Sequence, residues 1–136
     1  MYQTVKKIAA HLMIAVSLMS VPAAAGAQQD ENRPQDREIR QTVRFAKGKS
    51  SIIIKKQIRR GTSHTYILKA RRGQRMQVVL TTRGQTSFTV YSPTEGAIED
   101  ADGVKDWVGD LTETGNYEIS IGTDNTANYT LEIAIK

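Results

Sequence analysis

The stretch NYEISIGTDNTANYTLEIAIK, Asn116 to Lys136, decides the fold class of this chain. It contains two runs in which apolar and polar side chains alternate, and the polar turn TDNTAN lies between them. A period of two is typical of β-strands that bury one face. The stretch therefore predicts two strands, each with one buried face. The apolar positions are Tyr117, Ile119, Ile121, Tyr129, Leu131, Ile133 and Ile135.

The same alternation continues toward the N-terminus. It predicts about eight strands, at residues 43–46, 51–58, 64–70, 75–82, 87–91, 106–111, 116–122 and 128–136. Turns rich in Gly, Pro, Asn and Asp separate these runs, and no part of them sustains a helical period. Short strands at a spacing of about ten residues favour an all-β fold, a single antiparallel β-sandwich with a jelly-roll-like arrangement.

The first 27 residues have the pattern of a cleaved signal peptide. Lys6 and Lys7 precede an apolar run at residues 8–21, and the small side chains of Ala25 and Ala27 fit cleavage after Ala27. The alternative is a membrane anchor, but a spanning helix needs about 20 apolar residues. We expect a periplasmic or secreted protein with no membrane span after cleavage.

Residues 28–42 are polar and charged, and they predict a short disordered leader. Residues 43–136 then form the β-sandwich domain. The chain has no cysteine, so packing rather than disulfide bonds must stabilise this domain.

Charge is unevenly distributed along the chain. Residues 28–85 contain fifteen Lys/Arg and four Asp/Glu, a balance of +11, whereas residues 86–136 contain two and ten, a balance of −8. In a sandwich the two halves interleave, so opposite charges on neighbouring strands can pair. The alternative is a bipolar surface that steers a charged partner.

Three arginines surround the turn of the segment LKARRGQRMQVVL, Leu68 to Leu80. Arg71, Arg72 and Arg75 lie where one alternating run ends and the next begins, which predicts the tip of a hairpin. Their charge is then either an ordinary solvated turn or part of a contact surface shared with Arg59 and Arg60 of the preceding turn.

Side chains suited to catalysis are few. After residue 27 the chain has one histidine, His64, and its neighbour Ser63 points to the opposite face of the same predicted strand. The two cannot form a nucleophile–base pair by themselves. We expect no enzymatic activity and no cofactor. We also expect no nucleic-acid partner, because the basic residues are not interleaved with aromatic ones.

Acidic residues cluster around Gly103, namely Glu99, Asp100, Asp102 and Asp106. Their spacing is similar to half of a calcium loop, but the further ligands and the flanking helices of that motif are missing. We therefore expect no metal site. Trp107, the one tryptophan, is expected to anchor the core rather than to stack on a sugar.

Five segments, in this order, resemble the bacterial inhibitors of g-type lysozyme. They are VRFAKGKSS, YILKARRGQRMQVVL, FTVYSP, DWVGDLTETGNYEISIG and NYTLEIAIK, and they span residues 43–136. The chain is also similar to the bacterial pre-peptidase C-terminal domain, through the Gly73-Gln74 turn and the turn of Thr114, Gly115 and Tyr117. Both resemblances imply a small secreted or periplasmic β-sandwich.

The inhibitor resemblance implies a non-enzymatic protein whose surface loops block the cleft of a lysozyme. In that family an arginine-rich loop before the final strand and a tyrosine after the second strand's glycine contact the enzyme. Here that loop is GTDNTAN, and Thr62 follows Gly61. The pre-peptidase resemblance implies instead a binding or accessory module for peptidoglycan or another envelope protein. The candidate partner-binding residues are Lys47, Lys49, Ser50, Arg59, Arg60, His64 and Tyr66.

Overall fold

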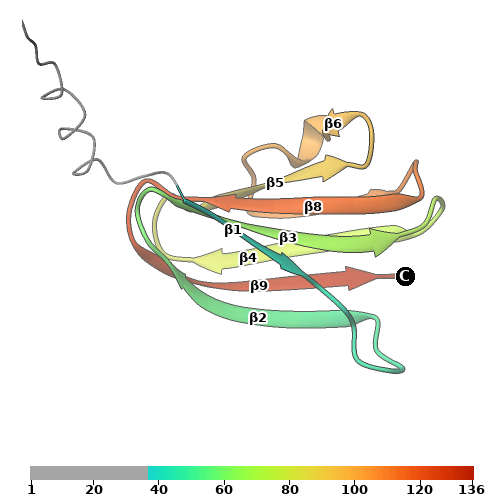
Figure 1. Ribbon diagram of the computed structural model, residues 1–136, viewed down its shortest axis with the longest axis horizontal. Helices are drawn as coiled ribbons and strands as arrows, with labels where there is room; N and C mark the ends of the chain where they lie inside the picture. The colour runs from blue at the N-terminus through green and yellow to red at the C-terminus, as the bar shows by residue number, and fades with distance from the viewer. Residues whose placement is uncertain (1–36) are drawn as a thin grey trace, which may run out of the picture. The chain divides into compact units, whose positions relative to one another are not determined.

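The computed structural model describes residues 37–136, which form two β-sheets packed face to face (Figure 1). The predicted signal peptide, residues 1–27, and residues 28–36 of the predicted leader lie outside the described residues. Within residues 37–136, no helix has the length and the apolar character that crossing a membrane requires.

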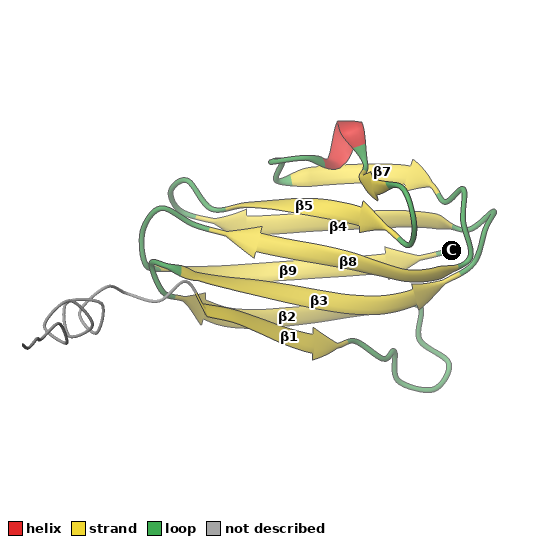
Figure 2. Ribbon diagram, turned by 45° about the horizontal axis from the view of Figure 1, so that its top comes forward, coloured by secondary structure: helices red, strands yellow, loops and turns green. Residues whose placement is uncertain are grey.

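One sheet has five strands in the order β1-β3-β8-β5-β6, and the other has four in the order β2-β9-β4-β7 (Figure 2). The five-stranded sheet consists of β1 (Arg37–Thr42), β3 (Thr62–Ala70), β8 (Gly115–Gly122), β5 (Ser87–Ser92) and β6 (Gly96–Ala97). The four-stranded sheet consists of β2 (Ser51–Ile58), β9 (Ala127–Ile135), β4 (Arg75–Thr82) and β7 (Asp106–Asp110). The predicted all-β sandwich is confirmed, with nine strands and one short 3₁₀ helix, η2 (Glu99–Ala101), among the described residues.

Nearly every connection crosses from one sheet to the other, because consecutive strands alternate between the sheets, apart from β5 and β6. The turn of Arg71 and Arg72 therefore joins β3 of one sheet to β4 of the other, and the predicted hairpin at this place is wrong. A sequence turn signal marks where the chain reverses, but it does not say which strands then pair. The crossing loops gather at the two ends of the sandwich.

The core lies between the sheets and is formed by the alternating apolar positions. The predicted faces of the last two strands are confirmed, because all seven of their apolar side chains are buried. Removing such a side chain from water stabilises the fold by about 1.5–3 kcal/mol. Fully buried residues with 0% exposure include Ile58, Met76, Val78, Val90, Ile119, Ile121, Leu131 and Ile133.

The start of the folded domain differs from the prediction. Residues 43–46 form no strand, whereas residues 37–42, expected in the disordered leader, form β1, which pairs with β3 in parallel. All six residues of β1 are exposed, so this strand has no alternation of burial that a sequence pattern could reveal. Backbone pairing and an ion pair from Arg40 to Glu118 of β8 hold it in place.

Candidate functional site

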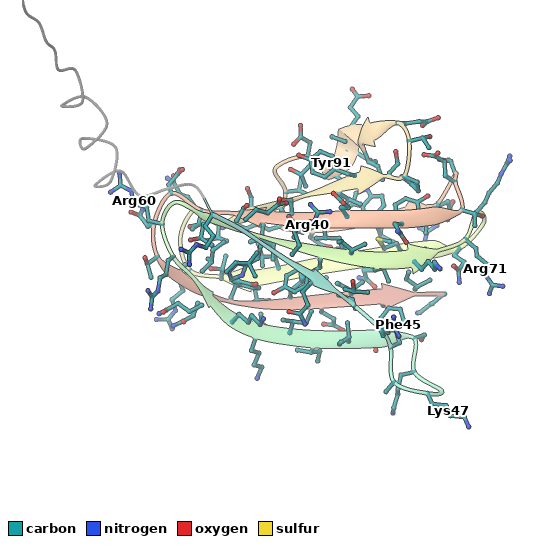
Figure 3. All side chains as sticks on the ribbon, viewed as in Figure 1. Arg40, Phe45, Lys47, Arg60, Arg71 and Tyr91 are labelled. Atoms are coloured by element: carbon teal, nitrogen blue, oxygen red, sulfur yellow. The ribbon has the colours of Figure 1, made fainter. Side chains whose placement is uncertain are left out.

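The predicted contact residues lie in two groups at opposite ends of the sandwich. Lys47, Lys49 and Ser50 belong to the loop between β1 and β2, whereas Arg59 and Arg60 belong to the turn between β2 and β3. The eight residues of β2 separate the two groups, a length of about 26 Å at about 3.3 Å per residue. Figure 3 shows Lys47 and Arg60 at these two ends. The two groups therefore do not form one contact surface.

His64 and Tyr66 lie inside the core. They are 6% and 1% exposed, and the hydroxyl of Tyr129 lies 2.6 Å from His64 Nδ1 and 2.5 Å from the Tyr66 hydroxyl. Burial and the charge of Lys56 lower the pKa of His64, and burial raises the pKa of both tyrosines. The expectation that His64 and Tyr66 face a partner is wrong, because the alternation of β3 turns both inward. The sequence does contain a signal for this burial, because His64 lies two residues before Tyr66 and so shares the apolar face of the predicted strand.

Three turns meet at the end of the sandwich that carries Arg59 and Arg60. We call it the arginine end, and it comprises residues 59–61 between β2 and β3, 83–86 between β4 and β5, and 123–126 between β8 and β9. The backbone N–H of Arg60 donates to Thr126 Oγ1 (3.3 Å), which joins the first turn to the third. Arg83 and Thr126 line one shallow hollow, which brings the second turn beside the third.

At the arginine end, positive charge exceeds negative charge, because Arg59, Arg60 and Arg83 outnumber its one acid, Asp124. Arg37 adds to this positive charge, because the backbone N–H of Arg37 donates to the carbonyl of Gly61 (3.0 Å). None of the ion pairs formed among residues 37–136 involves Arg37, Arg59, Arg60 or Arg83. A guanidinium group presents a planar set of donors that matches a carboxylate. The arginine end is therefore suited to an acidic surface or cleft.

Arg83 was not among the residues that the sequence singled out. Its turn, TRGQT, is visible as a turn signal, but it lies far along the chain from Arg59. The order β2-β9-β4 brings the two turns to either side of the β8–β9 loop. That loop carries no arginine of its own, and the neighbouring turns supply arginines beside it.

Charge is also separated between the two edges of the sandwich. Residues 37–60, which include the edge strands β1 and β2, carry nine Lys/Arg and one Asp/Glu. Residues 92–113, which include the edge strands β6 and β7, carry one Lys/Arg and seven Asp/Glu. Ion pairs do join the two halves of the chain, from Arg40 to Glu118 and from Arg75 to Asp110 (3.0 Å). The surface nevertheless remains bipolar. The charge pattern therefore produces both ion pairs between strands and a separation of charge across the surface.

The acidic segment serves structural contacts. Glu99 and Asp100 belong to η2, and the carboxylate of Asp102 accepts a hydrogen bond from the Thr89 hydroxyl (2.9 Å). In the part of the chain that the structure describes, no three His, Asp or Glu side chains gather as metal ligands.

Trp107 packs in the core, as predicted, with 6% of its surface exposed. Its indole ring lies against Gly109, two residues further along β7. A Cβ atom at Gly109 would lie 2.4 Å from Cζ2 of the ring, closer than atoms can approach. The glycine is therefore what lets the ring fold back over its own strand.

Comparison with known proteins relates this sandwich to lysozyme inhibitors. No protein-family model matches the chain, and no curated protein matches its sequence. Among solved structures, PliG of Aeromonas hydrophila, a periplasmic inhibitor of g-type lysozyme, is similar with a TM-score of 0.65 and 25% identity over 74% of this chain and 99% of PliG. A mutant of Escherichia coli PliG, also an inhibitor of g-type lysozyme, has a TM-score of 0.60 and 23% identity over 74% and 99%.

The pre-peptidase C-terminal domain of a Bacillus anthracis collagenase is more distant, with a TM-score of 0.49 and 10% identity. The expected resemblance to the inhibitor fold is confirmed, and both PliG neighbours are periplasmic inhibitors of an enzyme.

Proposed function

We propose that this protein binds and inhibits a g-type lysozyme, and that it acts in the periplasm without catalysing a reaction. The observation that carries the proposal is the similarity to Aeromonas hydrophila PliG, which extends over 99% of that chain. The predicted signal peptide agrees with an exported protein. Because the sequence has no cysteine, the domain depends on packing alone for its stability.

The arginine end is the surface that we propose enters the enzyme cleft. Glycoside hydrolases cleave their substrates with a pair of carboxyl groups, so the cleft of a lysozyme is acidic at its centre. Arg59, Arg60 and Arg83 have no intramolecular acid partner among residues 37–136. Complementary charge of this kind speeds the encounter of two proteins and fixes their orientation.

Two positions that the resemblance associates with enzyme contact belong to this same end. They are Thr62, which directly follows the first turn of this end, and the loop at residues 122–128, which contains its third turn. Neither position carries the family's tyrosine or arginines. We propose that Arg59, Arg60 and Arg83 replace them, because hydrogen bonds join both of their turns to the β8–β9 loop.

The turns are short and well anchored, which favours binding. Thr123 Oγ1 donates to the carbonyl of Asn125 (2.5 Å), and the hydroxyls of Thr86 and Thr123 lie 2.9 Å apart. A loop that is ordered before binding loses little entropy when it enters a cleft.

The test is lysis of a peptidoglycan suspension by g-type and c-type lysozymes, with the purified protein titrated at two salt concentrations. Saturable protection near one inhibitor per enzyme, against the g-type enzyme alone, supports the proposal. No protection against either enzyme contradicts it. Sedimentation of the protein with peptidoglycan in the absence of lysozyme would then favour an envelope-binding module.

A further inference from the structure

A pocket of about 450 Å³ opens at the end of the sandwich opposite to the arginine end. We call it the terminal pocket. The β1–β2 loop forms one wall, the β3–β4 turn forms another, and the β7–β8 turn and the end of β9 complete it. Figure 3 shows Phe45 and Arg71 at this end.

The floor of the terminal pocket is apolar. Ala70 and Ile135 are buried residues from the two opposing sheets, and Phe45 packs against the same core cluster. The pocket thus reaches the end of the hydrophobic core. An occupant with an apolar group would remove this surface from water, which favours binding.

The rim of the terminal pocket is cationic. Lys49 comes from the β1–β2 loop, Lys69 and Arg71 come from the end of β3 and the turn after it, and no acidic side chain lines the pocket with them. None of the three takes part in an ion pair within residues 37–136. Glu113 directly precedes Thr114, which lines the pocket, but its carboxylate accepts a hydrogen bond from the Thr94 hydroxyl. The terminal pocket therefore combines an apolar floor with unpaired positive charge.

Hydrogen bonds hold the walls in position. The backbone N–H of Arg71 donates to Gln74 Oε1 (2.7 Å), and that of Arg72 donates to Thr114 Oγ1 (2.9 Å). Within the four-stranded sheet, the backbone N–H of Ile135 donates to the carbonyl of Ser50 (2.8 Å), which holds the β1–β2 loop against the end of β9. A preformed pocket needs little ordering when a ligand binds.

We propose that the terminal pocket binds the C-terminal carboxylate of a peptide whose last side chain is apolar. The carboxylate pairs with the rim of Lys49, Lys69 and Arg71, and the side chain contacts the floor. The volume lies within the range of about 300–1,000 Å³ that is typical of small-ligand sites. This inference goes beyond lysozyme inhibition, because the pocket lies at the other end of the sandwich and needs no enzyme.

The test is titration of the ¹⁵N-labelled protein with three defined peptides, followed by NMR. The peptides are N-acetyl-Ala-Leu with a free carboxylate, the same peptide as its C-terminal amide, and N-acetyl-Ala-Gly with a free carboxylate. We expect the free acid with leucine to bind best and to shift the amide signals of Ala70, Arg71 and Ile135. Added salt should weaken its binding, because the rim is solvent-exposed.

Matched variants locate the site. Lys69→Gln and Arg71→Gln should each weaken binding about two- to fivefold, as expected for an exposed charge pair. Lys47→Gln removes the same charge from the same end, but Lys47 does not line the pocket, so binding should stay unchanged. Equal binding of the amide, or an equal loss in Lys47→Gln, overturns the proposal. Inorganic phosphate that binds as tightly as the peptide overturns the role of the apolar floor.

Discussion

The hydroxyl of Tyr129 lies 2.6 Å from Nδ1 of His64, and this contact links β9 of one sheet to β3 of the other through the core. The Tyr66 hydroxyl lies 2.5 Å from the same oxygen, so the Tyr129 hydroxyl is the shared partner of His64 and Tyr66. Lys56 lies close enough to affect His64, and its ammonium group donates to Gln41 Oε1 (2.9 Å). Buried polar groups that are paired in this way cost little stability, whereas unpaired ones cost much.

We expect the free energy of unfolding to fall as the pH is lowered from 7 toward 5. The pKa of His64 lies below its ordinary value of 6.5 in the folded protein, because of burial and the charge of Lys56. The unfolded chain therefore binds more protons than the folded one as the pH drops below about 6.5, and stability is lost in that window. Thermal unfolding at several pH values measures the slope. His64→Gln should flatten it, and an unchanged slope in that variant would assign the effect to other groups.

Tyr129→Phe should destabilise the protein by about 1–3 kcal/mol, because the change leaves His64 and Tyr66 without their shared partner. Urea unfolding measures the difference. The matched control is Tyr91→Phe, since Tyr91 is an exposed tyrosine on β5, and its effect should stay within about 0.5 kcal/mol. Similar losses in the two variants would mean that the buried hydroxyl contributes nothing specific.

Gly109→Ala should displace the indole ring of Trp107 and destabilise the core by about 1–3 kcal/mol, the usual cost of overpacking. Tryptophan fluorescence reports the displacement directly, because the chain has one tryptophan. Gly122→Ala is the control, since its added Cβ meets nothing within 4 Å. A native emission spectrum in Gly109→Ala would contradict the packing described for this ring.

Removal of β1 should lower the melting temperature. A chain that starts at Val43 exposes the edge of β3 that β1 covers, whereas a chain that starts at Arg37 keeps the pairing. Each lost backbone hydrogen bond costs about 0.5–1.5 kcal/mol, offset in part by the entropy that β1 regains. Calorimetry on the two chains measures the difference. Identical melting would mean that the folded domain begins at Val43 after all.

Arg60→Ala should raise the inhibition constant for a g-type lysozyme at least about fivefold, or about 1 kcal/mol, if the arginine end carries the contact. Lys47→Ala removes one positive charge at the opposite end and should leave inhibition unchanged. Both residues are exposed, so neither substitution should affect folding. A larger loss of inhibition in Lys47→Ala than in Arg60→Ala would show that the contact surface lies at the opposite end.

Alternation along single strands made much of the fold predictable. The predicted bounds 51–58 and 75–82 coincide with β2 and β4, and the predicted inward faces match the buried side chains. This works because side chains of a strand alternate between its faces whatever the strand pairs with. The two-residue strand β6 and the fully exposed β1 have no such pattern, and both were missed.

The candidate site was much less predictable. Lys49 and Arg59 flank the same strand, and the sequence offers both as candidate partner-binding residues. The eight extended residues of β2 place them at opposite ends. Arg83 is remote in sequence, yet its turn lies beside the β8–β9 loop, as does the turn of Arg60.

By itself, the sequence of this protein determined the fold class, most strand bounds and the inward faces, because these follow from the local period of apolar residues. Only the tertiary structure decided that β8 and β9 belong to different sheets and that His64 is buried against Tyr129. It also decided that the arginine end and the terminal pocket lie at opposite ends of the sandwich. Those relations depend on which strands pair across the sandwich. Pairing is set by contacts between residues far apart in the chain, and the periodicity of one strand does not specify those contacts.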